Sequence, residues 1–363
     1  MTGTPPDIAA PWAERTAGKA VTRAQEPARL GLVLVNYKRW SDTIECLESV
    51  FRSTIPLRVI VVDNGSDDGS LDRIAEWAQG TREATALNAD MAQFSQPPLP
   101  KPIPFRRLAT TGLADAGGPS DVPLTLIDSG GNLGFAAGNN IGLRLLLTDP
   151  RIGFFWLLNN DTVIEPTAAA ALVTRMSATH KIGMCGTVVR FYHRPDTIQV
   201  LGGSSFSLLT GQGRGIGGRE PASKAYDPAK VAAQIDFVLG ASLATSREFL
   251  EVVGPMDESF FLYFEEIEWA KRSAGRFSIS FAHGATVYHK EGGSIGSSGV
   301  PGKRSIASDY WLTRSRLTFI RRYAPILLPW HWLLTLAIAA RRVLRGQLAK
   351  AGVILRAMFG MKY

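Results

Sequence analysis

The sequence is poor in cysteine and lacks an apolar leader segment. Of 363 residues, two are cysteines, Cys46 and Cys185, and neither shows the spacing of metal ligands. We therefore expect no disulfide framework and take a reducing cytoplasm as the default compartment. Residues 1–28 are rich in Ala, Thr and Pro and have no apolar core, so we expect a disordered tail there and no secretory signal.

A glycine-rich phosphate cradle is also missing after the first apolar run. That run is followed by VNYKRW (35–40), where a dinucleotide-binding fold would carry a G-x-G-x-x-G turn. This absence argues against a dinucleotide-dependent oxidoreductase.

Acidic residues are absent from the C-terminal part of the chain. Residues 310–363 contain ten Lys and Arg and no Asp or Glu, so the formal net charge of +8 belongs to this end. Such a segment suits an anionic partner, either a lipid surface or a nucleic acid. Residues 326–340 (ILLPWHWLLTLAIAA) favour lipid, because Trp330 and Trp332 suit a membrane interface and two arginines follow at once.

This apolar run is short for a membrane span. A spanning helix needs about 20 apolar residues, and residues 326–340 fall below that length. We expect residues 323–363 to form a helical tail that lies on an anionic membrane surface or re-enters it, with no nucleic acid bound. The alternative is a core helix packed on the preceding domain.

Apolar runs alternate with helical patterns over most of the chain and predict an α/β fold. Continuous apolar runs are typical of strands buried on both faces of a sheet. We expect strands over 30–35, 57–62, 124–127, 154–158, 182–189 and 235–239, and shorter ones over 277–281 and 286–288. We expect helices over 41–53, capped by Ser41, 71–78, 132–148, 246–253 and 305–323, and one with Pro166 in its first turn.

Two regions lack such periodicity. Residues 81–123 hold most of a proline cluster and are interpreted as an inserted loop. Residues 202–218 are rich in glycine and are predicted to be flexible. The expected division is a tail (1–28), a catalytic domain (29–322) with the insertion at 81–123, and the helical tail (323–363).

Polar loops follow three of the expected strands, where open α/β sheets bind ligands. They cover residues 63–70, 132–140 and 159–162. The carboxylate of Asp63 can accept hydrogen bonds from a nucleobase N–H or a ribose hydroxyl. A turn that caps the next helix explains the first loop equally well.

The third loop reads Asn159-Asn160-Asp161 and suggests a metal site. Mg²⁺ and Mn²⁺ prefer oxygen ligands and are usually held by one or two carboxylates together with phosphates. Asp161 suits that role, although an Asx turn before the Pro166 helix is the alternative. His289, in VYHKEGGS (287–294), is a candidate metal or phosphate ligand, with a purely structural role as the other reading.

Acidic residues crowd among aromatics in FFLYFEEIEW (260–269). Apolar surroundings and like-charged neighbours raise the pKa of a carboxyl group. Glu265, Glu266 or Glu268 would thereby suit a general base that takes a proton from a hydroxyl. The alternative is a solvated helix N-terminus, where Glu is favourable.

These motifs occur in one order along the chain: VNY (35–37), VVDNGSDDGS (61–70), GNLGFAAGNNIG (131–142), LLNNDT (157–162), a Gly-Ala-Ser step at Gly240 and FLYFEEIEW (261–269). The series resembles the family 2 inverting glycosyltransferases with the GT-A fold, and within them the bacterial rhamnosyltransferase-like branch. The resemblance covers about residues 30–322 apart from the insertion. It implies a Rossmann-like, mostly parallel central sheet flanked by helices.

The resemblance also implies roles for individual residues. Asp63 would contact the base of the nucleotide, and the rest of the nucleotide-sugar pocket would be formed by Asn36, Tyr37, Ser66, Asn132, Gly134, Asn139 and Asn160. Asp161 would hold a divalent metal as the last carboxylate of the family's Asp-x-Asp motif, whose first position is Asn159 here. His289 would be a second metal or diphosphate contact. Glu266 would be the catalytic base, with Glu265 as the backup.

The implied reaction is a single in-line displacement that inverts the anomeric configuration. The donor would be a nucleotide-diphosphate sugar, dTDP-rhamnose by branch resemblance, with UDP- and GDP-sugars open. The acceptor would be a glycan or lipid-linked glycan in cell-surface polysaccharide synthesis. We expect a cytoplasmic enzyme, peripheral on the inner face of the plasma membrane and compatible with a homo-oligomer. The alternative is a non-catalytic nucleotide-sugar-binding or scaffold protein on the same fold.

Overall fold

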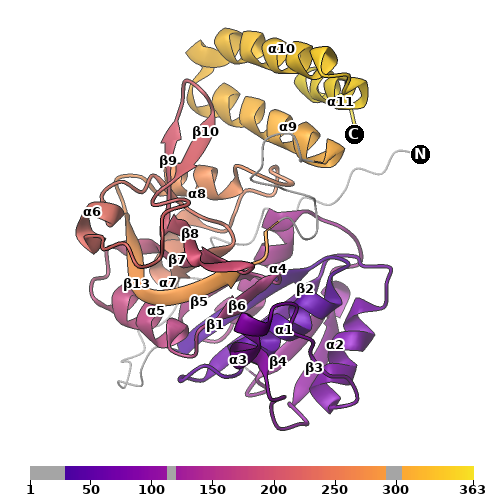
Figure 1. Ribbon diagram of the computed structural model, residues 1–363, viewed down its shortest axis with the longest axis vertical. Helices are drawn as coiled ribbons and strands as arrows, with labels where there is room; N and C mark the ends of the chain where they lie inside the picture. Colours follow the sequence, from indigo (N-terminus) through magenta and orange to yellow (C-terminus); the bar gives the residue numbers. More distant parts are fainter. Residues whose placement is uncertain (1–28, 113–119, 292–304) are drawn as a thin grey trace.

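The computed structural model describes residues 29–112, 120–291 and 305–363. The expected tail over residues 1–28 and the glycines that follow His289 lie outside these ranges. At the centre is a ten-stranded sheet with the order β3-β4-β2-β1-β5-β12-β7-β13-β6, in which β8 also pairs with β7 (Figure 1). Its strands are β1 (Arg29–Asn36), β2 (Leu57–Asp63), β3 (Phe105–Ala109), β4 (Leu124–Asp128), β5 (Ile152–Asn159), β6 (Thr162–Ile164), β7 (Ile182–Phe191), β8 (Arg194–Leu201), β12 (Ser242–Ser246) and β13 (Ser278–His289).

The half of the sheet from β3 to β5 is entirely parallel. Beyond β5 the sheet is mixed, because β12 runs antiparallel to both of its neighbours. The predicted α/β class with a mostly parallel central sheet is therefore confirmed.

Helices cover both faces of this sheet. On one face lie α1 (Trp40–Val50), α2 (Ser70–Gln79) and α5 (Ala168–Ser177); on the other lie α4 (Phe135–Leu147), α7 (Arg247–Val253) and α8 (Glu265–Ser273). Side chains alternate along a strand, so Leu32 packs in the first core and Val33 in the second. Burial on both faces explains why β1 has an unbroken apolar run.

The proline-rich segment 81–123 is more than a loop. Residues Phe105–Ala109 form β3, which pairs in parallel with β4 at the edge of the sheet. A short helix, α3 (Ala92–Ser95), packs near α1, and Met91 and Ile103 are buried. The strand was missed because FRRLA is a partly exposed edge strand and lacks the continuous apolar run of a central one.

The glycine-rich segment 202–218 was predicted to be flexible, and it instead contains two strands. β9 (Gly203–Ser207) and β10 (Gln212–Gly215) form an antiparallel hairpin, to which β11 (Phe237–Val238) adds a third strand. A Cβ placed on Gly203 would lie 2.2 Å from the carbonyl oxygen of Phe237. Close backbone approach therefore requires glycine at this position.

Smaller differences concern element ends. β13 is one strand with a register shift between Ala282 and Thr286, where two short strands were predicted. The N-cap of α1 is Arg39, so the prediction of Ser41 as the cap is wrong. Pro166 precedes α5, whose N-cap is Thr167. A short helix, α6 (Pro228–Ala232), completes the segment before β11.

The C-terminal part consists of α9 (Ile306–Tyr323), α10 (Leu328–Leu344) and α11 (Leu348–Met358). These three helices pack on one another at one end of the molecule, beyond the β9–β10 hairpin (Figure 1). α9 is joined to the sheet domain through stacking of Trp311 on Phe261, with ring centroids 4.3 Å apart. Among the helices of the described ranges, none has the length and apolar character needed to cross a bilayer.

Candidate functional site

The residues singled out from the sequence gather along one edge of the sheet. In the strand registers, Asn36 is paired with Asp63 and Val35 with Asn159, so the ends of β1, β2 and β5 lie side by side. The amide of Asn159 donates to the carbonyl oxygen of Ala241 at 2.9 Å. The adjacent Gly240 faces Glu266, since a Cβ built on it would lie 3.4 Å from Glu266 Oε1. One edge therefore links the Asp63 loop to Glu266.

The Asp63 carboxylate is buried and held by its own loop. Its Oδ1 accepts hydrogen bonds from Asn36 Nδ2 and Ser66 Oγ, each at 2.6 Å, and its Oδ2 accepts one from the Ser66 amide at 3.1 Å. Each carboxylate oxygen has two lone pairs, so Oδ2 keeps capacity for one more donor. Tyr37, directly after Asn36 in the connection between β1 and α1, is half-buried.

Asn36 and Asn160 connect two of the loops beneath this edge. Asn160 Nδ2 donates to Asn36 Oδ1 at 3.2 Å and to Thr43 Oγ1 at 2.9 Å, and the Thr43 hydroxyl donates to Asn36 Oδ1 at 2.8 Å. All three side chains are buried. Their bonds fix the start of α1 against the Asn159-Asn160-Asp161 loop.

The glycine-rich loop before α4 is tied to both ends of the site. Asn64, which follows Asp63, donates to Asn132 Oδ1 at 3.2 Å and to the Gly134 carbonyl at 3.1 Å. Gly134 has φ +87°, and a Cβ there would lie 2.4 Å from the carbonyl oxygen of Phe261. Asn139 is buried within α4, where its amide donates to the Phe135 carbonyl at 2.9 Å. In this structure Asn139 supports α4.

Asp161 and His289 form a buried pair. Asp161 Oδ1 lies 3.2 Å from His289 Nε2, and His289 Nδ1 lies 3.0 Å from Gln199 Oε1. Burial opposes both charges, yet His289 and Lys290 outweigh it and lower the pKa of Asp161. Likewise Asp161 outweighs the effect of burial and raises the pKa of His289. The two groups therefore stabilise each other's charged form.

The same two residues suit a hard divalent cation. A carboxylate oxygen and an imidazole nitrogen lie next to each other, and Mg²⁺ is commonly held by one or two carboxylates plus phosphate and water. Gln199 accepts from His289 Nδ1 and so turns Nε2 toward Asp161, which is how metal-binding histidines are usually oriented. Within the described ranges no group of three or more His, Cys, Asp or Glu side chains is arranged so that it could hold a metal ion by itself. A bound ion would therefore need further ligands from phosphate and water.

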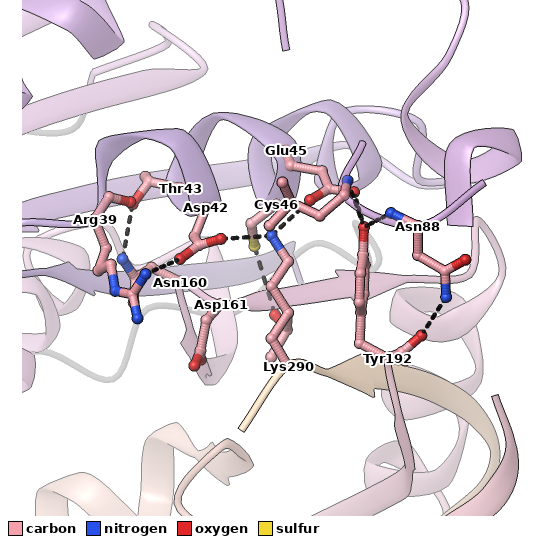
Figure 2. Close-up of polar contacts among 12 residues, drawn as sticks. Arg39, Asp42, Thr43, Glu45, Cys46, Asn88, Asn160, Asp161, Tyr192 and Lys290 are labelled. Carbon is pink, nitrogen blue, oxygen red and sulfur yellow. Dashed lines mark hydrogen bonds and ion pairs between the residues drawn. The ribbon is translucent and has the colours of Figure 1, made fainter. Parts of the chain in front are cut away.

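Lys290 is a buried neighbour that the sequence did not single out. Its ammonium group donates to Asp42 Oδ1 and Glu45 Oε2, both at 2.6 Å, and Tyr192 donates to the other oxygen of Glu45 (Figure 2). The Lys290 amide donates to the Asp161 carbonyl at 2.9 Å. This network fastens the Asp161 loop to α1. Asp42 and Glu45 lie more than 240 positions before Lys290 in the chain, so no local sequence pattern predicts these ion pairs.

Glu265, which is buried, and Glu266, which is half-buried, stand in the first turn of α8. The Oε2 atoms of both are buried, with no hydrogen-bond partner in the described part of the chain. Burial raises the pKa of Glu266 to about 7, and burial together with the Glu266 charge raises that of Glu265 well above its usual range. Glu268, the third acid of the motif, is bound to Arg272 and accepts from Tyr323 at 2.6 Å.

The turn before α8 is held in an uncommon conformation. Tyr263 and Phe264 have φ of +65° and +72°, a region that non-glycine residues rarely occupy. α9 secures this turn, because Ser315 donates to the Leu262 carbonyl at 2.8 Å and Tyr263 shares a hydrogen bond with Ser308 at 2.8 Å. Such strain persists only where surrounding contacts enforce it, and it often accompanies a functional site.

Comparison with known proteins identifies the N-terminal half of this edge. Residues 32–87, which contain most of β1, all of β2 and the Asp63 loop, match the model of glycosyl transferase family 2. The low-salt glycan biosynthesis hexosyltransferase Agl10 of Haloferax volcanii is 28% identical over 147 residues, 40% of this chain and 45% of the relative. The chain thus spans about half the length of the curated relative that it matches.

Solved structures give weaker likenesses. The mannosyltransferase PcManGT from Pyrobaculum calidifontis, in complex with GDP-Man and Mn²⁺, is matched over 97% of this chain and 81% of its own, with 15% identity and a TM-score of 0.46. GalNAc-T7 with UDP, GalNAc and Mn²⁺ is matched over 80% of this chain and 48% of its own, with 11% identity and a TM-score of 0.47.

The sequence comparisons agree with the ordered motifs. The family match covers the Asp63 loop, and the structure joins that loop through β5 to the remaining motifs on one edge. Over residues 32–87 the chain is therefore similar to the family 2 glycosyltransferases.

Proposed function

We propose that the chain is an inverting glycosyltransferase that moves a hexosyl group from a nucleotide-diphosphate sugar to an acceptor hydroxyl. The observation on which this mainly rests is the Glu266 carboxylate. The residue is half-buried, its Oε2 is buried without a hydrogen-bond partner in the described structure, and its Oε1 faces Gly240 on the edge shared with Asp161. A pKa near 7 allows such a group to accept a proton at neutral pH.

In the proposed mechanism the chain's own residues divide the work. The free acceptor capacity of Asp63 Oδ2 binds a nucleobase N–H or a ribose hydroxyl, while Asn36, Ser66 and Asn160 hold the loops in place. Asp161 and His289 would hold Mg²⁺ or Mn²⁺, which supplies stabilisation of the negative charge on the departing diphosphate. Glu266 takes the proton from the acceptor oxygen as that oxygen attacks the anomeric carbon, and Glu265 is the alternative base.

The lack of a covalent intermediate follows from the role of Glu266. A base that removes the acceptor proton leaves that oxygen to displace the nucleotide diphosphate in a single step, so the anomeric configuration inverts. Asn159 replaces one carboxylate of the Asp-x-Asp motif, so the protein offers the metal few charged ligands. We therefore expect weak metal binding in the absence of the nucleotide sugar.

Finer assignments are part of the proposal. The catalytic domain covers residues 29–322, and residues 323–363 form a separate helical part. The first donor to consider is dTDP-rhamnose, and the acceptor is a glycan or a lipid-linked glycan of the cell surface. The enzyme would act in the cytoplasm, on the inner face of the plasma membrane.

A donor screen tests this function. Purified protein is incubated with dTDP-rhamnose, UDP- and GDP-sugars and Mn²⁺ or Mg²⁺, and release of nucleotide diphosphate is measured with and without chelator. We expect slow hydrolysis of one donor in the absence of acceptor, abolished by chelator and restored by added metal. A scaffold protein would bind a donor without releasing nucleotide diphosphate. If no donor releases nucleotide diphosphate, with or without glycan acceptors, the proposal is overturned.

A further inference from the structure

We propose that the outer face of α10 docks into the interface of an anionic lipid bilayer. The evidence is the way in which this helix is oriented on the protein. Docking itself does not depend on the transfer reaction; the idea that the bilayer presents the acceptor rests on the proposed function.

The solvent-facing side of α10 is apolar. Leu333 is 62% exposed, Leu336 44% and Val343 49%. Helical residues at spacings of three, four and seven share one face, so these side chains form a continuous stripe along the helix. Other exposed apolar side chains lie along or next to it: Ile326, Trp330, Trp332, Leu344 and, on or after α11, Leu348 and Phe359.

The polar side of the same helix points into the protein. His331 and Thr335 are fully buried, one helical turn apart. His331 Nε2 is bonded to the Leu208 carbonyl at 2.8 Å, and Thr335 accepts a hydrogen bond from Arg316 of α9 at 2.7 Å. Arg342, a further two turns along, binds Asp309 of α9 at 2.9 Å. α10 is thus inverted relative to an ordinary surface helix of a soluble protein, whose apolar stripe faces the core.

The inversion is fixed by specific bonds. Trp330 Nε1 donates to the Leu209 carbonyl at 2.8 Å, so the turn of the β9–β10 hairpin holds the start of α10 at two points. Figure 1 shows this hairpin reaching toward the junction of α9 and α10, with α10 outermost. Rotating α10 to bury its leucines would break these bonds and expose a buried arginine and histidine.

Charge decides between a bilayer and a second copy of the chain. Residues 310–363 contain ten Lys and Arg and no Asp or Glu. Arg341 and Arg345 are exposed at the C-terminal end of α10, beside the apolar stripe. Two copies of this face would bring like charges together without acids to pair them, whereas anionic headgroups attract basic residues near the surface. Exposed tryptophan beside leucine and arginine is the composition of an interfacial helix.

Docking of α10 would also fix the distance between the membrane surface and the candidate base, Glu266. α9 contacts α10 on one side and the turn before Glu265 on the other, through Trp311 on Phe261 and Ser315 on Leu262. An acceptor held in the bilayer would then meet Glu266 from the side that faces the membrane.

Vesicle sedimentation tests the docking. Full-length protein is mixed with vesicles of phosphatidylcholine alone. In a second set of vesicles about 30 mol% of the lipid is phosphatidylglycerol, which is anionic. The double variant Leu333→Ser/Leu336→Ser removes the apolar stripe, and Arg341→Gln/Arg345→Gln removes the exposed cations. Leu87→Ser, which changes a leucine of similar exposure (63%) on the sheet domain, is the matched control.

We expect the native protein and the Leu87 variant to bind anionic vesicles, and each double variant to bind at least about tenfold more weakly. Circular dichroism melting curves should stay unchanged, since all these side chains are exposed. Equal binding of the leucine double variant and the native protein would overturn the proposal. A second result would also overturn it: the native protein binds neither type of vesicle, and sedimentation velocity shows a dimer that the leucine substitutions dissociate. Donor hydrolysis without acceptor should be the same in the native protein and all variants, and its absence from the native protein would instead count against the proposed function.

Discussion

The two ends of the candidate site differ in whether their acidic side chains have a cationic partner. At the Asp161 end, three buried acids have a cationic partner: Asp161 faces His289, and Asp42 and Glu45 share Lys290. At the α8 end, Glu265 is buried and the adjacent Glu266 half-buried, and in the described structure each has a buried oxygen without a hydrogen-bond partner.

This difference distinguishes a structural role for the paired charges from a chemical role for the carboxylates of α8. Paired charges keep their protonation state over a wide pH range and fix the backbone around them, as Lys290 does for the Asp161 loop. Unpaired buried carboxylates gain affinity for a proton, which is what a base requires. The molecule thus keeps a rigid charged framework at one end of the edge and a proton acceptor at the other.

The largest expected effect comes from Glu266→Gln. The amide cannot accept the acceptor proton, so kcat for sugar transfer should fall by about 10²–10⁴-fold, the usual contribution of a positioned base. Donor binding should be unchanged, because the Asp63 and Asp161 loops do not contact this side chain through any bond of the described structure. Steady-state kinetics and donor titration measure the two quantities.

Glu265→Gln is the matched control for this variant. If Glu266 is the base, the rate of the native enzyme should fall as the pH drops below about 7, where the carboxylate becomes protonated. Normal turnover in Glu266→Gln together with inactivity of Glu265→Gln would transfer the role to Glu265.

The next effect concerns the paired end. Lys290→Met leaves Asp42 and Glu45 buried without their cation, and removing one partner of a buried ion pair usually costs about 3–5 kcal/mol. We expect the free energy of unfolding, measured with urea, to fall by this amount. Lys38→Met breaks the exposed pair with Asp67 and should change it by less than about 1 kcal/mol. Equal losses in the two variants would show that the Lys290 network is not a structural anchor.

The smallest effect is a gain in stability at the unpaired end. Folding raises the pKa of Glu266 from 4.5 to about 7, so the folded protein binds this proton more tightly than the unfolded chain does. Its contribution to stability is present at low pH and is lost as the pH rises through about 4.5–7. Glu266→Gln should therefore be more stable than the native protein at pH 8, by about 1–3 kcal/mol.

The comparison of both proteins at pH 5 and pH 8 checks this sign. At pH 5 the native carboxyl group is largely protonated, and the two unfolding free energies should agree closely. A variant that is less stable than the native protein at pH 8 would mean that the ionised Glu266 has a stabilising partner.

Local sequence was enough to predict the parallel half of the fold and the positions of the polar loops. Unbroken apolar runs such as LGLVLV (30–35) can be satisfied only by burial on both faces, and strand ends in a parallel sheet must meet at one edge. The order of the motifs also indicated the resemblance to family 2 glycosyltransferases, whose model matches residues 32–87. The edge strand β3 and the β9–β10 hairpin escaped prediction, because their pairing depends on neighbours and not on their own periodicity.

The motif at Asn159-Asn160-Asp161 and the acids at 265 and 266 were visible in the sequence, but their environments were not. A carboxylate's pKa depends on which charges lie within a few ångströms, and Lys290 reaches Asp42 and Glu45 only after β13 has been placed beside the Asp161 loop. The basic, tryptophan-bearing C-terminus was equally visible. Only the tertiary structure decided that α10 turns its polar side inward, since that choice depends on bonds from Arg316 and the β9–β10 turn that no helical pattern contains.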